Sequence, residues 1–245
     1  MAVQIATTTA LVTGANRGIG RALAEALLER GATRVYATAR RRETLDSLVA
    51  LGAGRVVPIE LDVTDQAQVA ALPAAAPDVT LLINNAGVAS HMSDTVDDDA
   101  WLEAGRAEFE VNVLGTFAVT QRLAPVLARN GGGAVVNIAS VVSFVGFPSF
   151  ATYAAAKAGT HSITQTTRQL LRGQGTFVAG AYPGPVDTDM AARITLDKAS
   201  PREVAHAILD GLEAGQEDIL PDPMARQMGA AFFSGPKQLE RPAAA

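Results

Sequence analysis

Three residues near the middle of the sequence, Ser140, Tyr153 and Lys157, have types and spacings that suit proton transfer. The segment Tyr153-Ala-Ala-Ala-Lys157 predicts a helix that carries both side chains on one face. A free tyrosine has a pKa of about 10, and a nearby ammonium lowers that pKa because it favours the phenolate. The apolar run over residues 134–139 predicts a buried strand that ends at Ser140. General acid–base chemistry is one interpretation, and a solvated helix start with a strand-end cap is the other.

A glycine-rich loop near the N-terminus predicts a phosphate-binding site. An apolar strand over residues 8–13 leads into Gly14, Gly18 and Gly20, and a helical pattern follows over residues 21–30. The first N–H groups of a helix and its positive dipole end together bind phosphate groups. The spacing Gly-x-x-x-Gly-x-Gly differs from the commoner Gly-x-Gly-x-x-Gly, but its place between strand and helix favours a dinucleotide loop.

The residues after the second predicted strand, residues 34–40, favour NADP over NAD. An NAD site carries an acidic residue about 20 positions after the glycines, to bind the ribose 2′-hydroxyl. This chain has Arg40, Arg41 and Arg42 there, with no carboxylate. A guanidinium pairs well with a 2′-phosphate, so we expect Arg40 to bind it and Arg17 to close on the same group. We expect Arg41 and Arg42 to be solvated residues of the next helix.

Polar or glycine residues follow the remaining predicted strands, residues 55–61, 79–83 and 176–182. Asp62 and Val63 are expected to flank an adenine, although Asp62 or Thr64 also suits a helix cap. The Asn84-Asn85-Ala86-Gly87 and Pro183-Gly184 segments suit either ligand binding or simple turns. Asn112 interrupts an apolar helix face over residues 101–129. Its amide must therefore bond to backbone or water, or serve the site.

Apolar strands alternate with helices six or seven times, which predicts an α/β fold with one doubly wound, Rossmann-type parallel sheet. The loops at the carboxyl ends of such strands gather into one site. We expect a single domain over residues 1–245. Its ordered core should span about residues 7–221, and residues 241–245 should fray.

Composition excludes several classes of function. The net charge of −5 argues against a nucleic-acid partner. The chain has no cysteine and three scattered histidines, so we expect no metal site. No secretory signal and no apolar run of about 20 residues is present, so we expect a soluble cytoplasmic protein without a membrane segment.

Taken together, these motifs resemble the short-chain dehydrogenases/reductases from about residue 7 to residue 221. The resemblance rests on residues 13–20 and 84–87 and on Asn112, Ser140, Tyr153, Lys157, Pro183 and Gly184. It implies a seven-stranded sheet and an NADP(H)-dependent carbonyl reductase.

The same resemblance implies a role for each catalytic residue. Tyr153 would be the proton donor or acceptor, and Ser140 would bind the substrate oxygen. Lys157 would hold the nicotinamide ribose and lower the pKa of the tyrosine. Asn112 would hold a relay water through a kink in its helix. The expected cofactor-binding residues are Gly14, Asn16, Arg17, Gly18, Ile19, Gly20, Arg40, Asp62, Val63, Asn85, Ala86, Gly87, Tyr153, Lys157, Pro183, Gly184, Val186 and Thr188.

The substrate is predicted from the apolar residues around the catalytic group. Residues 141–150, Met190 and Met92 suggest an apolar wall, which favours a hydrophobic ketone or aldehyde. A 3-oxoacyl chain on an acyl carrier protein is an alternative, with Arg129 and Arg172 either docking that carrier or simply ending their helices. A non-catalytic NADP-sensing protein is a second alternative. The segment over residues 188–200 is short for the family and predicts an open pocket.

The resemblance also implies a homodimer or homotetramer. Related proteins pair the helices that correspond to residues 101–129 and 153–172 across a two-fold axis. Small or apolar residues on the second helix suit close packing of this kind, namely Ala154, Ala155, Ala158 and Ile163. A monomer whose alanines only reflect helix propensity is the alternative.

Overall fold

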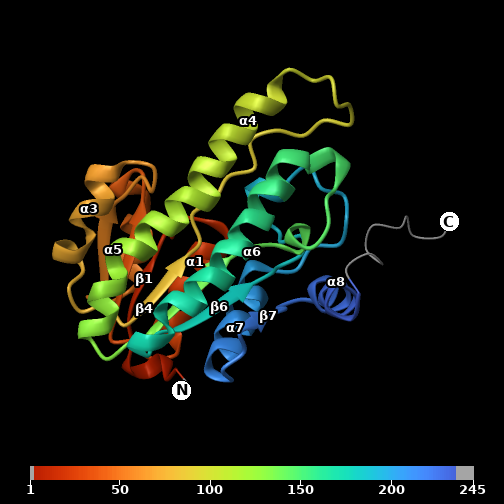
Figure 1. The fold of residues 1–245 in the computed structure, drawn as a ribbon. Coiled ribbons are helices and arrows are strands. Elements are labelled where there is room, and N and C mark those ends of the chain that lie inside the picture. Colours follow the sequence, from red (N-terminus) through yellow and green to blue (C-terminus); the bar gives the residue numbers. More distant parts are fainter. Residues whose placement is uncertain (1–2, 236–245) are drawn as a thin grey trace.

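In residues 3–235, which the computed structural model describes, seven parallel strands form one central sheet (Figure 1). The sheet has the order β3-β2-β1-β4-β5-β6-β7, so the chain winds outward from β1 and then crosses to β4 and winds the other way. Ligands bind at such a reversal in doubly wound sheets. The strands are β1 (Thr9–Val12), β2 (Arg34–Ala39), β3 (Val56–Glu60), β4 (Leu81–Asn84), β5 (Ala134–Ile138), β6 (Phe177–Ala181) and β7 (Asp218–Ile219).

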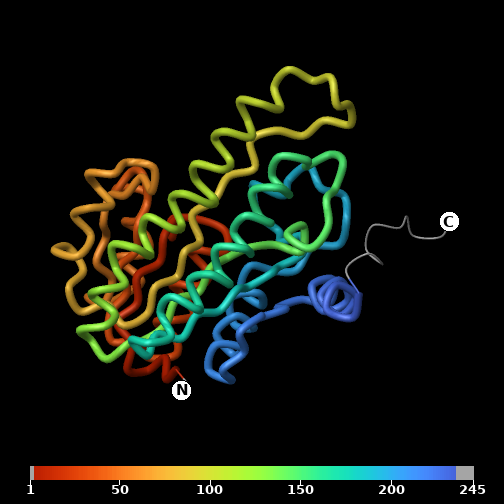
Figure 2. Tube along the Cα trace, viewed as in Figure 1, coloured from red at the N-terminus to blue at the C-terminus, as the bar shows by residue number. Residues whose placement is uncertain are grey.

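Helices cover both faces of the sheet, which explains why its strands are apolar on both sides. Along β1, Ala10 and Val12 pack into the cluster on one face, whereas Leu11 packs into the cluster on the other. The first cluster lies under α1 (Gly18–Glu29), α2 (Asp46–Leu51) and α7 (Pro201–Glu213). The second lies under α3 (Gln66–Ala75), α5 (Thr116–Arg129) and α6 (Ala151–Leu171). The trace in Figure 2 shows α5 and α6 running side by side across the sheet.

The long helix predicted over residues 101–129 is interrupted. It consists of α4 (Ala100–Phe109), a π-helical segment (Glu110–Gly115) and α5. π-Helical turns inside α-helices often occur at functional sites, and this one contains Asn112. The helix expected after β2 is also divided, into a 3₁₀ turn (Arg42–Leu45) and α2. In Figure 1, α4 extends beyond the sheet together with the loop that precedes it.

A helix beyond the predicted core, α8 (Pro223–Ser234), closes the described chain. Asp222 caps it, since its Oδ1 accepts a hydrogen bond of 2.9 Å from the Ala225 amide. Phe232 of α8 stacks on Phe144, with ring centroids 4.7 Å apart. The expected end of the ordered core at about residue 221 was therefore wrong. The expectation of a frayed end at residues 241–245 lies outside the described residues. Within residues 3–235, no helix has the length and apolar character needed to cross a membrane.

Candidate active site

Loops at the carboxyl ends of the strands enclose a cavity of about 1170 Å³. The cavity wall contains Ser140, Tyr153, Lys157 and every residue expected to bind the cofactor. Asn112 is buried behind that wall. The structure thus brings together side chains from both ends of the sequence, because parallel strands deliver their following loops to one edge of the sheet.

The glycine loop after β1 approaches the loop after β4 too closely for side chains. Gly14 and Gly18 have φ angles of 65° and 56°, in the left-handed region. A Cβ on Gly20 would collide with the Gly14 carbonyl oxygen and with Asn85 Nδ2. Arg17 is the N-cap of α1 but provides no side-chain cap, so the first amides of the helix have no side-chain acceptor there. This arrangement fits the binding of a phosphate group.

Thr13 and Asn85 connect the two loops. Asn85 Nδ2 donates to the carbonyl oxygens of Thr13 (2.9 Å) and Gly14 (3.1 Å). Thr13 Oγ1 in turn accepts from the backbone amides of Asn85 and Ala86, both at 2.9 Å. The Asn85 side chain therefore shapes the cavity through these backbone contacts. The structural role of Thr13 was missed from the sequence, although Thr13 belongs to the motif.

Arginine and aspartate side chains line one end of the cavity. Arg40 follows β2 and is exposed, whereas Arg17 forms an exposed ion pair of 2.9 Å with Asp189. Burial alone would raise the pKa of Asp62. Hydrogen bonds from Thr64 and the charge of Arg40 hold that pKa below its usual value. Asp65, rather than Asp62 or Thr64, caps α3, since its Oδ1 accepts from the Ala67 and Gln68 amides.

Tyr153 and Lys157 lie on one face of α6, as the spacing predicts. The Lys157 ammonium lies 5.7 Å from the centre of the Tyr153 ring and donates to the Ile138 carbonyl oxygen at 2.8 Å. This hydrogen bond to Ile138 uses one of the three N–H donors of the Lys157 ammonium. Ser140 lies at the end of β5, where its Oγ donates to the Pro183 carbonyl oxygen at 3.3 Å. Ser143 connects the two elements, since its hydroxyl donates to the Lys157 carbonyl oxygen at 2.9 Å.

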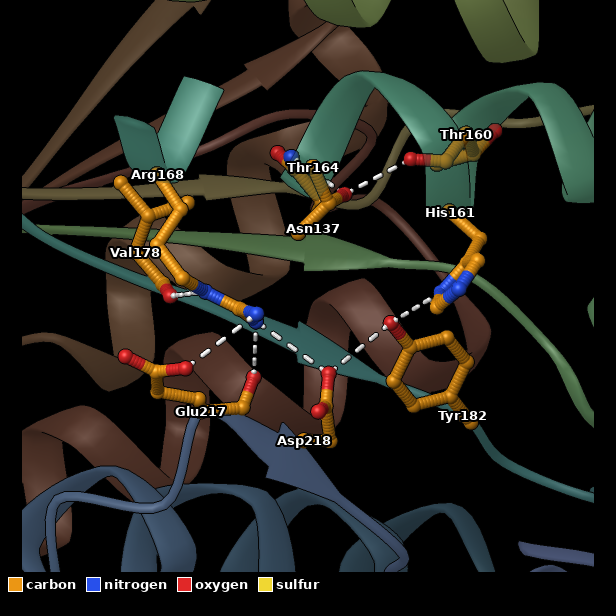
Figure 3. A network of polar contacts seen from close by, with 9 residues as sticks. All are labelled: Asn137, Thr160, His161, Thr164, Arg168, Val178, Tyr182, Glu217 and Asp218. Carbon is orange, nitrogen blue, oxygen red and sulfur yellow. Dashed lines mark hydrogen bonds and ion pairs between the residues drawn. The ribbon is translucent and has the colours of Figure 1, made fainter. Parts of the chain in front are cut away.

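Polar contacts along α6 fix the rotation of this helix against the sheet (Figure 3). Asn137 of β5 donates to Thr164 Oγ1 at 2.9 Å, and Arg168 donates to the Val178 carbonyl oxygen at 3.0 Å. His161 Nδ1 lies 2.7 Å from the Tyr182 hydroxyl, which donates to Asp218. These contacts are spread over several turns of α6. They therefore orient its first turns, where Tyr153 and Lys157 project into the cavity.

The Asn112 side chain forms its hydrogen bonds with the backbone of Val88. Its Oδ1 accepts from the Val88 amide at 3.0 Å, and its Nδ2 donates to the Val88 carbonyl oxygen at 2.8 Å. The backbone carbonyl of Asn112 accepts from Thr160 Oγ1 at 3.0 Å. Asn112 therefore holds the segment after β4 and contacts α6. The sequence did not indicate Glu108, a fully buried carboxylate one turn earlier on α4.

The protonation of Tyr153 differs from the expectation. Burial raises the pKa of Tyr153, and the charge of Glu108 raises it further. The sequence predicted a pKa lowered by Lys157. Burial also acts on that ammonium, and it lowers the pKa of Lys157 to about 8. The prediction considered only the distance between the two side chains, whereas desolvation is the largest cause even though Tyr153 is only partly buried in the cavity wall.

The substrate end of the cavity is apolar. The part of the wall that follows Ser140 contains Val141, Val142, Phe147 and Phe150, and Met190, Ile194, Leu196 and Met224 complete it. Phe144 was expected there but packs on Tyr182 and α8 instead. Met92 does not line the cavity. The short segment over residues 188–200 forms one side, and its base is closed by hydrogen bonds between Asp187, Ala199 and Pro185. Within the described chain, no group of three or more potential metal ligands occurs.

Comparisons with known proteins agree with this geometry. A sequence model of the short chain dehydrogenase family matches residues 8–199. The 3-oxoacyl-[acyl-carrier-protein] reductase FabG of Thermotoga maritima is 34% identical over 220 residues, which cover 81% of this chain and 87% of the relative.

Two solved structures are similar over nearly the whole chain. One is a short chain dehydrogenase from Burkholderia cenocepacia in complex with NADP, with a TM-score of 0.90 and 38% identity, covering 98% of this chain and 100% of that one. The other is a short-chain dehydrogenase from Sphingobium yanoikuyae in complex with NADPH, with a TM-score of 0.81 and 28% identity, covering 97% and 98%.

Proposed function

The chain belongs to the short-chain dehydrogenase family of oxidoreductases, and we propose that it uses NADP(H) to reduce a hydrophobic ketone or aldehyde. One observation carries this proposal. A single cavity has a glycine loop and arginines at one end, Ser140, Tyr153 and Lys157 in its wall, and an apolar surface at the other end. Such a cavity suits a dinucleotide on one side and an apolar carbonyl compound on the other.

Three features support NADP(H) as the cofactor. The close approach at Gly20 and the N-terminus of α1 suit a pyrophosphate. Arg40 and Arg17 suit the 2′-phosphate, because a guanidinium pairs with phosphate oxygens through two parallel hydrogen bonds. Two similar solved structures contain NADP or NADPH. When bound, NADPH supplies the hydride for reduction of the carbonyl carbon.

The chain's own residues polarise and protonate the carbonyl group. The hydroxyls of Ser140 and Tyr153 would donate hydrogen bonds to the carbonyl oxygen and stabilise the negative charge that develops on it. Tyr153 would then transfer its proton to that oxygen, and its raised pKa keeps it protonated beforehand. The Lys157 ammonium, anchored on Ile138, would stabilise the phenolate that remains.

A 3-oxoacyl group carried by an acyl carrier protein is the second candidate substrate, because the relative from Thermotoga maritima bears that name. The two arginines considered for docking the carrier do not support it. Arg172 follows the last turn of α6, about 28 Å along the helix from Tyr153. Arg129 ends α5, which likewise runs away from the active site. A carrier protein would need other contacts at the cavity mouth.

A panel of carbonyl compounds tests this proposal, with the absorbance of NADPH as the readout. Aryl ketones, long-chain aldehydes, sugars and 3-oxoacyl thioesters of acyl carrier protein are compared at equal concentration. We expect the apolar ketones and aldehydes to be turned over fastest, because the substrate wall is apolar. Turnover of only the carrier-bound thioesters would favour the second candidate. NADPH binding without turnover of any compound would favour an NADP-sensing protein.

We also propose that the chain forms a homodimer or homotetramer through α4, α5 and α6. Large apolar side chains are exposed on these helices and on the π-helical segment between α4 and α5, namely Leu102, Phe109, Leu114, Phe117 and Leu170. Exposed large apolar side chains on neighbouring helices suit a protein interface. Ala155 and Ala158 of α6 are exposed as expected, whereas Ala154 is buried within the domain.

A further inference from the structure

Glu108 is a buried carboxylate with an unusual environment. Its side chain is fully buried on α4, and its Oε1 accepts a hydrogen bond of 2.7 Å from the Ser90 amide. Its second oxygen, Oε2, is buried and has no hydrogen-bond partner in the structure. No ion pair of Glu108 occurs within residues 3–235. Buried charges are normally paired, so such a group calls for a specific role.

The first contact of Glu108 is with the cavity wall. Asn112, one helical turn later, binds both backbone groups of Val88, and Glu108 binds the amide of Ser90. Val88 and Ala89 line the cavity directly after Gly87. Glu108 and Asn112 therefore act as two neighbouring clamps on the same extended segment. Loss of either clamp would free a part of the wall.

The second contact of Glu108 is electrostatic and is directed at α6. Gly105, almost one turn before Glu108, lies against Thr152, since a Cβ on Gly105 would be 3.0 Å from Thr152 Cγ2. Thr152 immediately precedes Tyr153, and its buried Oγ1 also has no partner. Consistent with this packing, the charge of Glu108 raises the pKa of Tyr153. A negative charge at this position disfavours a second negative charge on the phenol.

We propose that Glu108 is a positioning residue of the active site: it holds residues 88–90 in the cavity wall and keeps the Tyr153 hydroxyl protonated for use as an acid. The second half of this proposal rests on the proposed reductase function. Lys157 and Glu108 then have opposite effects on the same hydroxyl, since the ammonium favours the phenolate and the carboxylate favours the phenol. Burial is the larger cause of the raised pKa of Tyr153, and the two charges adjust the pH range in which Tyr153 acts as an acid.

Other charged groups also lie on the elements around Tyr153. On α4, Glu103 and Arg106 are exposed. The following Glu110 is also exposed and lines the cavity. On α6, Lys157 is the charged group next to Tyr153. In the loop before α4, His91 pairs with Asp98 at 2.9 Å. Glu108 is thus the buried carboxylate among these groups. A variant without its negative charge therefore reports the effect of that charge on Tyr153.

The variant Glu108→Gln tests the electrostatic half of the proposal. Glutamine keeps the size and the acceptor for Ser90 but removes the charge. Alcohol oxidation needs the phenolate, so its kcat/KM rises with pH as Tyr153 ionises. We expect this rise to move to lower pH, because the phenolate is no longer disfavoured by the neighbouring negative charge. Glu103→Gln, the same change at an exposed site of α4, should leave the profile unchanged. Superimposable profiles for Glu108→Gln and wild type would refute this half.

Hydrogen exchange tests the positioning half without any turnover, so it stays informative if the proposed function fails. Glu108→Met fills a similar volume but lacks an acceptor for the Ser90 amide. We expect peptides that contain residues 88–92 to exchange at least tenfold faster than in wild type, whereas Glu108→Gln should retain their protection. Unchanged exchange in Glu108→Met would overturn the clamp. If Glu108→Met does not fold, faster exchange of the same peptides in Glu108→Gln would overturn it instead.

Discussion

The variant Gly20→Ala tests whether the glycine loop is shaped by close backbone approach. The structure places the added Cβ against the Gly14 carbonyl oxygen and Asn85 Nδ2. The carbonyl belongs to the loop backbone and cannot rotate away. Asn85 can rotate only by giving up its hydrogen bonds to Thr13 and Gly14. The methyl group must therefore displace the loop after β1, the loop after β4, or both.

The magnitude follows from these two effects. Overpacking in a well-packed site costs about 1–3 kcal/mol, and each lost hydrogen bond costs about 0.5–1.5 kcal/mol. With one of the two Asn85 hydrogen bonds lost, we expect the free energy of unfolding to fall by about 1.5–4.5 kcal/mol in total. For a chain of this size, that corresponds to a decrease in Tm of roughly 3–18 °C. NADPH affinity should fall as well, because the displaced loop is the one expected to hold the pyrophosphate.

Thermal unfolding and calorimetric titration with NADPH measure both effects. The matched control is Gly173→Ala, since Gly173 is exposed, has no positive φ angle, and a Cβ on it would meet nothing within 4 Å. This control should be neutral or slightly stabilising, because alanine restricts the unfolded chain. If Gly20→Ala matched the control in both Tm and NADPH affinity, the close approach at Gly20 would contribute neither to stability nor to cofactor binding.

Two further variants test the cofactor and the assembly. Arg40→Asp should weaken NADPH binding roughly tenfold to a hundredfold, from the loss of ~1.5–3 kcal/mol, and shift preference toward NADH. Arg42→Asp, which alters a neighbouring exposed arginine outside the cavity wall, is the control, and equal effects of the two changes would show that Arg40 does not select the cofactor. Leu114→Glu places a charge on the exposed face of the π-helical segment, so light scattering should report a smaller particle than for wild type while the circular dichroism spectrum is retained. An unchanged oligomer in that variant, or a wild-type monomer, would contradict the proposed interface.

Local sequence patterns were sufficient to predict the fold. Short apolar runs that end in glycine, asparagine or serine predicted the strands and the edge of the sheet at which the loops gather. The spacing of Tyr153 and Lys157 predicted their common face on α6. These predictions succeed because helix and strand periodicity and glycine conformation are properties of neighbouring residues.

Features that depend on tertiary packing were not predictable in this way. Glu108 looks like an ordinary helix glutamate until α6 and the segment after β4 bury it. The helix periodicity gave no sign of the π-helical turn at Asn112, and the break there was expected only from the family resemblance. The helix α8 was not predicted, although Asp222 and Pro223 form an N-terminal helix signal. Phe144 was expected in the substrate wall, but its ring stacks on Phe232 of α8 instead. The raised pKa of Tyr153 likewise arises from desolvation, which spacing alone does not reveal.

The measurement that tests the central claim most directly is the comparison of turnover and NADPH binding in Tyr153→Phe. The change removes one hydroxyl and leaves the ring, so it should remove the proton donor and little else. We expect the rate of carbonyl reduction to fall by about 10²–10⁴, the contribution of a positioned general acid. NADPH affinity, measured by calorimetry, should stay within roughly threefold of wild type, well under 1.4 kcal/mol. A variant that reduces the same substrate at a rate comparable to wild type would contradict the assignment of Tyr153 as the acid.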